Sequence, residues 1–341
     1  MRKIIISIVL STLICANFTF SQSLYHVTDK INIPGNGSWD YLVVDEPTNT
    51  LFVSHANEMD VVDLNVNKLI TIQKDFKGIH GIALVKDFDM CYISNGKDNS
   101  VTVIDLETYE FVKNIKITGK NPDAILYEPV SQKIFTFNAG SSNATMIDVN
   151  TLKVVGTIKL PGKPEFAVTN LKGHLYVNIE NTNSICVINV KTLKMEKIWS
   201  IKPGKTPSGL AIDIENNRLF SVCDNKMMVV VDSETGKVVT TVKIAKDVDG
   251  VAYDPILKRI FVSSGQGILT VIQQEDADNY SILENVKTQK GACTIALNSE
   301  THKIYLPTAE YNPAAKPTAK NPKPRATVKA GSFTVLEVGM K

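Results

Sequence analysis

Apolar and polar residues form short alternating runs along this chain, and the same order of runs returns about every 42 residues. One repeat contains Gly81-Ile-Ala-Leu-Val85, Tyr92-Ile-Ser-Asn-Gly96, Val101-Thr-Val-Ile-Asp105 and the apolar stretch 111–117. Turn-forming residues separate the runs, so each repeat is predicted to hold four short strands. A period of this length in β-rich segments is typical of a β-propeller, in which each repeat forms one four-stranded sheet.

A polar residue ends the third strand of every repeat and places the repeats in one register. These residues are Asp63, Asp105, Asp148, Asn189, Asp232, Gln273 and Glu337. Acidic and amide side chains before a tight turn accept hydrogen bonds from the backbone N–H groups of that turn. Because the position recurs in every blade, we interpret its aspartates as structural and not catalytic.

Seven first strands are followed by only six complete fourth strands. The segment Tyr25–Gly35, at the start of the chain, matches the fourth-strand pattern. We expect it to pair with Thr334–Val338 and so to close the ring without an open sheet edge. The fold class is therefore all-β, and residues 22–341 are predicted to form one seven-bladed β-propeller of four-stranded antiparallel blades.

The N-terminus has the pattern of a secretory signal peptide. Two basic residues precede the apolar stretch 4–15, and a polar exit ends near Ser21, which predicts a signal over residues 1–21. Lipid attachment at Cys15 is the alternative, but the bulky Ile14 precedes that cysteine. We expect an exported protein, periplasmic or extracellular, with outer-membrane association if it is lipidated. No other stretch has the length and apolarity to span a membrane.

The positions and spacing of the four cysteines outside the signal give no indication of disulfides or of a metal-binding or haem-attachment motif. Cys91, Cys186, Cys223 and Cys293 fall in four different blades, so no two thiols are expected within bonding reach. No CxxC pair, histidine-spaced zinc pattern or CxxCH sequence occurs in the chain.

The segment 311–331 is a basic, proline-rich loop. It contains Lys316, Lys320, Lys323, Arg325 and Lys329 and no acid. As the loop between the second and third strands of the last blade, it overhangs the face on which all innermost strands begin. Its composition predicts an extended, mobile arm. Its charge suits an anionic polymer as a partner, and the rest of the ring is mildly acidic.

The same face carries the candidate chemistry. One residue per blade is predicted to line the channel mouth: Asp40, His80, Asp123, Glu165, Ser208, Asp249 and Cys293. Just outside them, the second strands end in polar residues on the first three blades: His55, Asn95 and Asn138. We take these residues, Cys293 excepted, as the candidate ligand-binding set, with His80 or His55 as a candidate acid or base.

Two interpretations of the mouth acids remain open. They can cap the backbone N–H groups of the turns between blades. Alternatively, crowded carboxylates and imidazoles would favour a protonated site or a divalent cation in the channel. Asp40, Asp123, Glu165 and Asp249 are the candidate metal ligands, and mixed oxygen and nitrogen donors suit calcium, magnesium or zinc alike.

Several phrases resemble the YncE-like, or YVTN-type, bacterial β-propellers. They include Asn121-Pro-Asp123, Thr206-Pro-Ser-Gly209 and Gly331-Ser-Phe-Thr-Val-Leu-Glu337. The resemblance implies the propeller fold and export, but no catalytic signature. We expect a monomeric binding or scaffold protein that engages a protein, peptide or small-molecule ligand through the loop face. The alternative is a metal-assisted hydrolase or lyase, by fold-level analogy with lactonase-like propellers.

Overall fold

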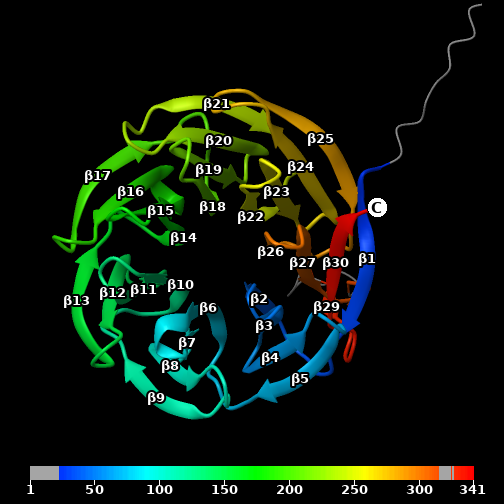
Figure 1. The fold of residues 1–341 in the computed structure, drawn as a ribbon, viewed down its shortest axis with the longest axis horizontal. Helices are drawn as coiled ribbons and strands as arrows, with labels where there is room; N and C mark the ends of the chain where they lie inside the picture. Colours follow the sequence, from blue (N-terminus) through cyan, green and yellow to red (C-terminus); the bar gives the residue numbers. More distant parts are fainter. Residues whose placement is uncertain (1–22, 315–323, 325) are drawn as a thin grey trace, which may run out of the picture.

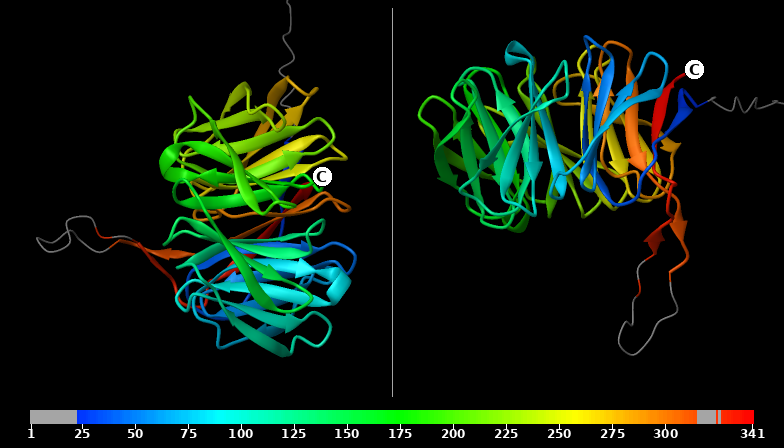
Figure 2. Two further views of the ribbon diagram at one scale, coloured as in Figure 1. Left: turned by 90° about the vertical axis from the view of Figure 1, so that its left-hand side faces the viewer. Right: turned by 90° about the horizontal axis from the view of Figure 1, so that it is seen from below.

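A computed structural model describes residues 23–314, 324 and 326–341. Within these ranges, seven four-stranded antiparallel sheets stand around a central axis, as Figure 1 shows. The predicted seven-bladed β-propeller is therefore confirmed. Seen from the side, the ring is a thick disc from which one hairpin projects (Figure 2). The predicted signal, residues 1–21, lies outside the described residues.

Six blades are built from four consecutive strands each, ordered from the channel outward. Blades 1 and 2 contain β2 (Trp39–Asp45), β3 (Thr50–His55), β4 (Glu58–Asp63), β5 (Lys68–Gln73), β6 (Ile79–Val85), β7 (Met90–Asn95), β8 (Ser100–Asp105) and β9 (Phe111–Lys116). Blades 3 and 4 contain β10 (Pro122–Glu128), β11 (Lys133–Asn138), β12 (Asn143–Asp148), β13 (Lys153–Lys159), β14 (Pro164–Thr169), β15 (His174–Ile179), β16 (Ser184–Asn189) and β17 (Lys194–Ser200). Blades 5 and 6 contain β18 (Pro207–Asp213), β19 (Arg218–Cys223), β20 (Met227–Asp232), β21 (Val238–Lys243), β22 (Val248–Asp254), β23 (Arg259–Ser264), β24 (Ile268–Gln274) and β25 (Tyr280–Lys287).

The seventh blade joins the two ends of the chain. Its strands are β26 (Ala296–Asn298), β27 (Lys303–Thr308), β30 (Thr334–Met340) and, outermost, β1 (Tyr25–Asn32). β1 pairs antiparallel with β30 from Asn32 opposite Thr334 to Tyr25 opposite Met340. The predicted closure by the N-terminal strand is confirmed, and it leaves blade 7 with a complete sheet.

The core lies between the blades. Second and third strands such as β7 and β8 are buried along almost their whole length, whereas fourth strands such as β9 are mostly exposed. The clusters of buried apolar side chains therefore join residues of neighbouring blades, for example Val101 and Val103 of blade 2 with Ile134 and Ile147 of blade 3. Each blade thus contributes a separate interface, which lets one closed domain reach this length.

The third-strand aspartates do what the sequence predicts. Oδ1 of Asp105 accepts hydrogen bonds from the backbone N–H groups of Glu107 and Thr108 at 2.9 and 2.8 Å. Asp148 and Asp232 make the same contacts in their blades. These side chains fix the turn between the third and fourth strands on the face opposite the arm.

Cysteine placement also follows the prediction. Cys91, Cys186 and Cys223 are fully buried, and all four cysteines among the described residues are free thiols.

Two short 3-10 helices, η1 (Lys86–Phe88) and η2 (Glu180–Thr182), are the only helical elements in the described ranges. None of the described helices has the length and apolarity to cross a bilayer.

The arm differs from a simple extended loop at its base. Its two ends form a short antiparallel stem, in which β28 (Tyr311–Asn312) pairs with β29 (Thr327–Val328). The indole of Trp39 contacts both Tyr311 and Phe333, with ring centroids 6.4 and 5.5 Å apart. The stem is thus anchored to blade 1, and Figure 2 shows it standing out from the disc.

The structure describes one of the five basic residues predicted for the arm. Lys316, Lys320, Lys323 and Arg325 lie outside the described residues. Lys329, in the returning half of the arm, forms an ion pair of 2.7 Å with Glu310. This pair partly neutralises the base of the arm.

Candidate functional site

Six of the seven predicted mouth residues occupy the second position of an innermost strand. They are Asp40 in β2, His80 in β6, Asp123 in β10, Glu165 in β14, Ser208 in β18 and Asp249 in β22. Blade 7 differs, because β26 begins at Ala296, three residues after Cys293. The structure therefore puts one residue of each of blades 1 to 6 at the channel mouth on the arm side of the disc, and Cys293 of blade 7 lies near Asp249 and Asp40.

A β-bulge in the innermost strand explains how these side chains reach the channel. In blade 1, Trp39 pairs with His55 but Leu42 pairs with Val53, so one extra residue is inserted at Asp40 and Tyr41. The same register shift occurs in blades 2 to 6. Bulges bend a strand and re-aim its side chains, and here they recur at the mouth position.

The residue after each mouth residue controls how closely the inner strands approach one another. It is Gly209 in blade 5, where an added Cβ would lie 2.4 Å from the carbonyl oxygen of Asp249. Gly81 and Gly250 are similarly crowded by the next blade. Tyr41 and Phe166 occupy this position in blades 1 and 4, and their ring centroids lie 5.3 Å apart. These two aromatic rings fill the middle of the channel.

Buried polar side chains of the second strands hold the bulges in place. The hydroxyl of Ser94 accepts a hydrogen bond from Gly81 N at 2.8 Å and donates one to the carbonyl of Asp123 at 2.7 Å. Asn178 donates to the carbonyls of Ser208 and Gly209 at 3.0 and 2.9 Å. The sequence reasoning missed these supports. Their signal is a polar residue just before the end of an otherwise apolar strand.

The mouth brings His80 between two carboxylates from its neighbouring blades. Its Nδ1 atom lies 2.6 Å from Oδ2 of Asp40 and 3.8 Å from Oδ1 of Asp123. Burial alone would lower the pKa of His80, but the hydrogen bond to Asp40 and the charges of both carboxylates outweigh it and raise that pKa. One ligating atom of each residue lies within 4.8 Å of the others, so the trio can share a proton or a cation.

The carboxyl groups of Asp123 and Asp249 are harder to ionise than those of ordinary aspartates. Burial and the nearby Asp40 raise the pKa of Asp123 to about 6. Burial, Asp40 and Asp123 together raise the pKa of Asp249 to about 7. A positive charge that enters the mouth would therefore stabilise the ionised form of these carboxyl groups.

One lysine already supplies positive charge on one side of the mouth. Nζ of Lys163 lies 2.6 Å from Oε1 of Glu165 and also contacts Glu180. Burial nevertheless raises the pKa of Glu165 above its ordinary range. Because Lys163 is shared between two carboxylates, the mouth still holds more acidic than basic groups.

Ser208 and Cys293 lack the features of activated nucleophiles. The Ser208 hydroxyl donates to the carbonyl of Val248 at 3.2 Å, and its described partners include no imidazole. Burial, with the charges of Asp249 and Asp40, raises the pKa of Cys293 to about 12, which keeps the thiol protonated.

The second-strand residues of the predicted set do not join the mouth. His55, Asn95 and Asn138 are almost fully buried inside their blades. His55 Nδ1 lies 3.1 Å from Oδ2 of Asp60, whereas Asn95 and Asn138 donate to Thr102 and Thr145 at 2.9 and 3.0 Å. The same bond between second and third strand thus recurs in three blades. The predicted set therefore divides into a mouth cluster and an interior cluster.

Other residues cap the turns between blades. The backbone N–H of Gly78 donates to Asn57, that of Asn121 to Asn99 and that of Lys163 to Asn181, at 2.7–2.9 Å. Among the described residues, the carboxylates of Asp40 and Asp123 make their polar contacts with His80 and accept no such backbone bond. The geometry therefore favours a collective role for the mouth acids over turn capping.

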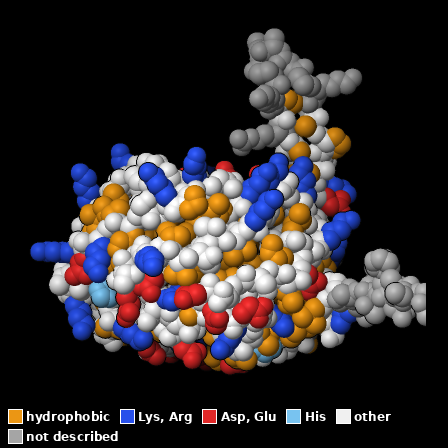
Figure 3. Space-filling view, turned by 90° about the horizontal axis from the view of Figure 1, so that it is seen from above, with side chains coloured by type: hydrophobic (Ala, Val, Ile, Leu, Met, Phe, Trp, Pro, Cys, Tyr) orange, Lys and Arg blue, Asp and Glu red, His pale blue; other side chains and the backbone are white. Residues whose placement is uncertain are grey.

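Lysines surround the acidic mouth at a greater radius. Loops on the arm side carry exposed lysines at positions Lys74, Lys77, Lys97, Lys116, Lys120, Lys202, Lys205, Lys226, Lys246 and Lys290. Figure 3 shows blue side chains along this side of the disc, whereas red side chains gather toward the opposite side. The arm face thus combines an acidic centre with a basic rim.

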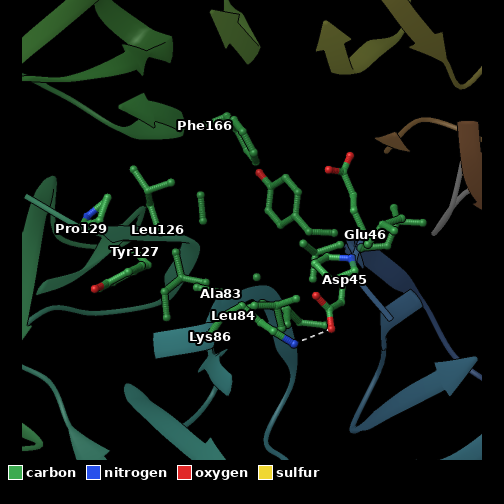
Figure 4. A pocket seen from close by; sticks show the side chains of 18 of the residues that line it. Asp45, Glu46, Ala83, Leu84, Lys86, Leu126, Tyr127, Pro129 and Phe166 are labelled. Atoms are coloured by element: carbon green, nitrogen blue, oxygen red, sulfur yellow. Dashed lines mark hydrogen bonds and ion pairs between the residues drawn. The ribbon is translucent and has the colours of Figure 1, made fainter. Parts of the chain in front are cut away.

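The channel widens again beyond the two aromatic rings. Tyr41 and Phe166 line both the narrow space beside Asp249 and a cavity of about 540 Å³ that opens on the opposite face. Inner strands of blades 1 to 4 form the walls of this cavity, which we call the apolar funnel, and Figure 4 shows Ala83, Leu84 and Leu126 facing it. The sequence analysis did not predict this space.

No protein-family model and no curated protein matches this chain. Solved structures do share its fold. A chain of the Kuenenia stuttgartiensis hydrazine synthase is similar at 16% identity with a TM-score of 0.71, over 80% of this chain and 94% of that one. A chain of the mitotic checkpoint complex is similar at 12% identity with a TM-score of 0.74, over 90% and 96% of the two chains. At these identities the likeness shows the propeller fold alone.

Proposed function

We propose that this protein is a binding propeller that engages its partner or ligand across the arm face. The observation that carries the proposal is the convergence of Asp40, His80 and Asp123 from three blades at one mouth. Bulges aim these residues at the channel, and the pKa values of His80 and Asp123 are both raised, which supports a site that favours added positive charge. A propeller fold is consistent with such a role, since its loop faces commonly serve as binding surfaces.

The charge pattern defines what the face would accept. The acidic centre suits a positively charged or hydrogen-bond-donating group of a protein, peptide or small-molecule ligand. The lysine rim and the basic arm suit anionic groups farther out, including an anionic polymer. We propose a monomeric, exported protein of the YncE-like kind, in line with its N-terminal pattern and its YVTN-type phrases.

A divalent cation at the mouth is the second candidate, and one specific observation favours it. Asp40, His80 and Asp123 bring one ligating atom each within 4.8 Å of one another, a donor set that zinc, magnesium or calcium can use. A cation there would support metal-assisted hydrolysis or a lyase reaction. His80 would then serve as a ligand, so a different group would have to act as the base.

Two measurements separate these candidates. Elemental analysis of the purified protein should show less than one divalent cation per chain if the mouth is a ligand site, and one per chain if it is a metal site. A thermal-shift screen with lysine- and arginine-containing tripeptides should give stabilisation that the combined Asp40→Asn and Asp123→Asn changes abolish. The matched control is Asp63→Asn on the opposite face, which should leave the response unchanged. An equal response in the double variant would reject the mouth as the binding site.

A further inference from the structure

We propose that the apolar funnel on the opposite face is a second binding site, for a small apolar cation. Its volume of about 540 Å³ lies within the usual range of small-molecule sites, roughly 300–1,000 Å³. Tyr41 and Phe166 form its floor, so a ligand there is separated from the acidic mouth.

The walls of the funnel are suited to an apolar body. Ala83, Leu84, Leu126 and Tyr127 line it, and none of these side chains carries a charge. Figure 4 shows these residues around the space, with Phe166 closing one side. Burying an aromatic or aliphatic group against such walls is favourable because it removes apolar surface from water.

The rim of the funnel decides the charge of the ligand. Nζ of Lys86 lies 2.6 Å from Oδ2 of Asp45, so these two charges neutralise each other. Glu46 also lines the funnel, and its Oε1 accepts hydrogen bonds from Ser299 N and Oγ at 2.6 and 2.7 Å. Among the described residues Glu46 has no cationic partner. An ammonium group at the rim would complete the contacts of this carboxylate.

The surrounding surface points to the same ligand charge. On the face where the funnel opens, the turns of blades 1 and 2 carry more acids than bases, among them Asp87 within η1, Asp89 directly after it, and Asp105 and Glu107 beyond it. Figure 3 shows acidic side chains toward this side of the disc. A cationic ligand would be attracted by this field and an anionic one repelled.

The test compares three probes that share one body. Calorimetric titration of the purified protein with 4-phenylbutylamine, 4-phenylbutanol and 5-phenylpentanoate places an ammonium, a hydroxyl or a carboxylate group on the same phenylbutyl body. We expect one equivalent of the amine to bind, the alcohol to bind about tenfold more weakly and the carboxylate more weakly still. Equal affinities for the three probes would overturn the proposal.

Variants locate the site. Glu46→Gln should reduce amine affinity to that of the alcohol, whereas Glu300→Gln, an exposed acid next to Ser299 on the same face, should not. Leu84→Trp should fill the funnel and abolish binding of all three probes. If Leu84→Trp does not fold, a diazirine analogue of the amine should instead crosslink to residues 83–86 of the unmodified protein. Crosslinks confined to the arm face would overturn the proposal.

The two sites are distinguishable. The combined Asp40→Asn and Asp123→Asn changes should leave amine affinity unchanged, because the aromatic floor lies between the mouth and the funnel. Loss of amine binding in this double variant, with none in Glu46→Gln, would assign the amine to the mouth and reject the funnel.

Discussion

The hydroxyl of Tyr25 accepts a hydrogen bond from Nη1 of Arg259 at 2.7 Å, and this contact ties blade 7 to blade 6. Tyr25 is fully buried, and its ring meets that of Phe261 edge to face at 5.4 Å. Its backbone N–H also donates to Glu284 at 2.8 Å. The strand that completes the last blade is therefore held by the neighbouring blade as well.

Removing this strand should open the ring. Deletion of residues 22–35 exposes the edge of β30, and we expect aggregation by size-exclusion chromatography or a large fall in melting temperature. Tyr25→Ala should cost about 3–5 kcal/mol of unfolding free energy, as is usual for a buried aromatic residue. Phe111→Ala, at an aromatic residue that is 68% exposed on β9, is the control and should change stability little. A deletion variant that stays monomeric with a normal melting temperature would contradict the closure.

Stability should fall as pH rises through the range in which the mouth acids ionise. Asp123 is protonated in both the folded and the unfolded chain below pH 4, but above that pH the unfolded chain releases its proton first, because the folded pKa is about 6. The stabilisation is fully present below pH 4 and lost by about pH 7. Asp123→Asn should therefore raise the unfolding free energy at pH 8 by up to about 3 kcal/mol and change it little at pH 4.

A turn aspartate provides the control with the opposite sign. Backbone and side-chain hydrogen bonds from Thr108 lower the pKa of Asp105, so its contribution is present at neutral pH and is lost as pH falls. Asp105→Asn should therefore be neutral or destabilising at pH 8. Thermal melts of both variants between pH 4 and 8 check the two signs. If Asp123→Asn destabilised the protein at pH 8, the mouth acid would be a structural element.

The crowded glycines of the inner strands should be intolerant of a methyl group. Gly209→Ala places a Cβ against the carbonyl of Asp249, so we expect a loss of about 1–3 kcal/mol and a shift of the mouth. Gly265→Ala, whose Cβ would meet its nearest neighbour at 3.5 Å, should be nearly neutral. Chemical denaturation of both variants measures the difference. Equal losses would show that close approach of the inner strands is not required.

The arm should separate into an anchor and a dispensable tip. Replacing residues 313–326 with a short Gly-Ser turn keeps the β28–β29 stem and should leave the melting temperature nearly unchanged. The same replacement should make binding at the arm face less sensitive to salt, since basic residues are removed. Phe333→Ala, in contrast, removes a buried ring that contacts Trp39 and should cost about 3–5 kcal/mol. Similar losses in the two variants would show that the tip is part of the folded ring.

The repeat pattern predicts the fold because each of its signals lies within a few neighbouring residues of the chain. Each strand is readable from its apolar run, and the position of Asp105 or Asp232 before a turn sets the register of a whole blade. Closure was also predictable, since a missing fourth strand and a matching N-terminal segment leave one solution. The stem of the arm was not, because two-residue strands such as Tyr311–Asn312 carry no periodic signal.

The candidate site was only partly predictable. Sequence register places Asp40, His80 and Asp123 at one mouth, but it does not show that a bulge aims them at the channel. The residues His55 and Asn95 look equally available in sequence, yet their side chains turn into the blade to meet third-strand partners. The size of the funnel depends on the distance between the inner strands of different blades. The sequence pattern of a single repeat does not predict that distance.

The pairing of β1 with β30 also constrains the order of assembly. Residues at opposite ends of the chain, such as Asn32 and Thr334, become hydrogen-bonded neighbours. β1 therefore has no partner in its own blade until β30 is available. Six blades consist of consecutive strands and can form without this contact, whereas the seventh needs strands from both ends of the ring. Until the seventh blade closes, β1 remains an unpaired strand to which a chaperone that shields extended segments can bind.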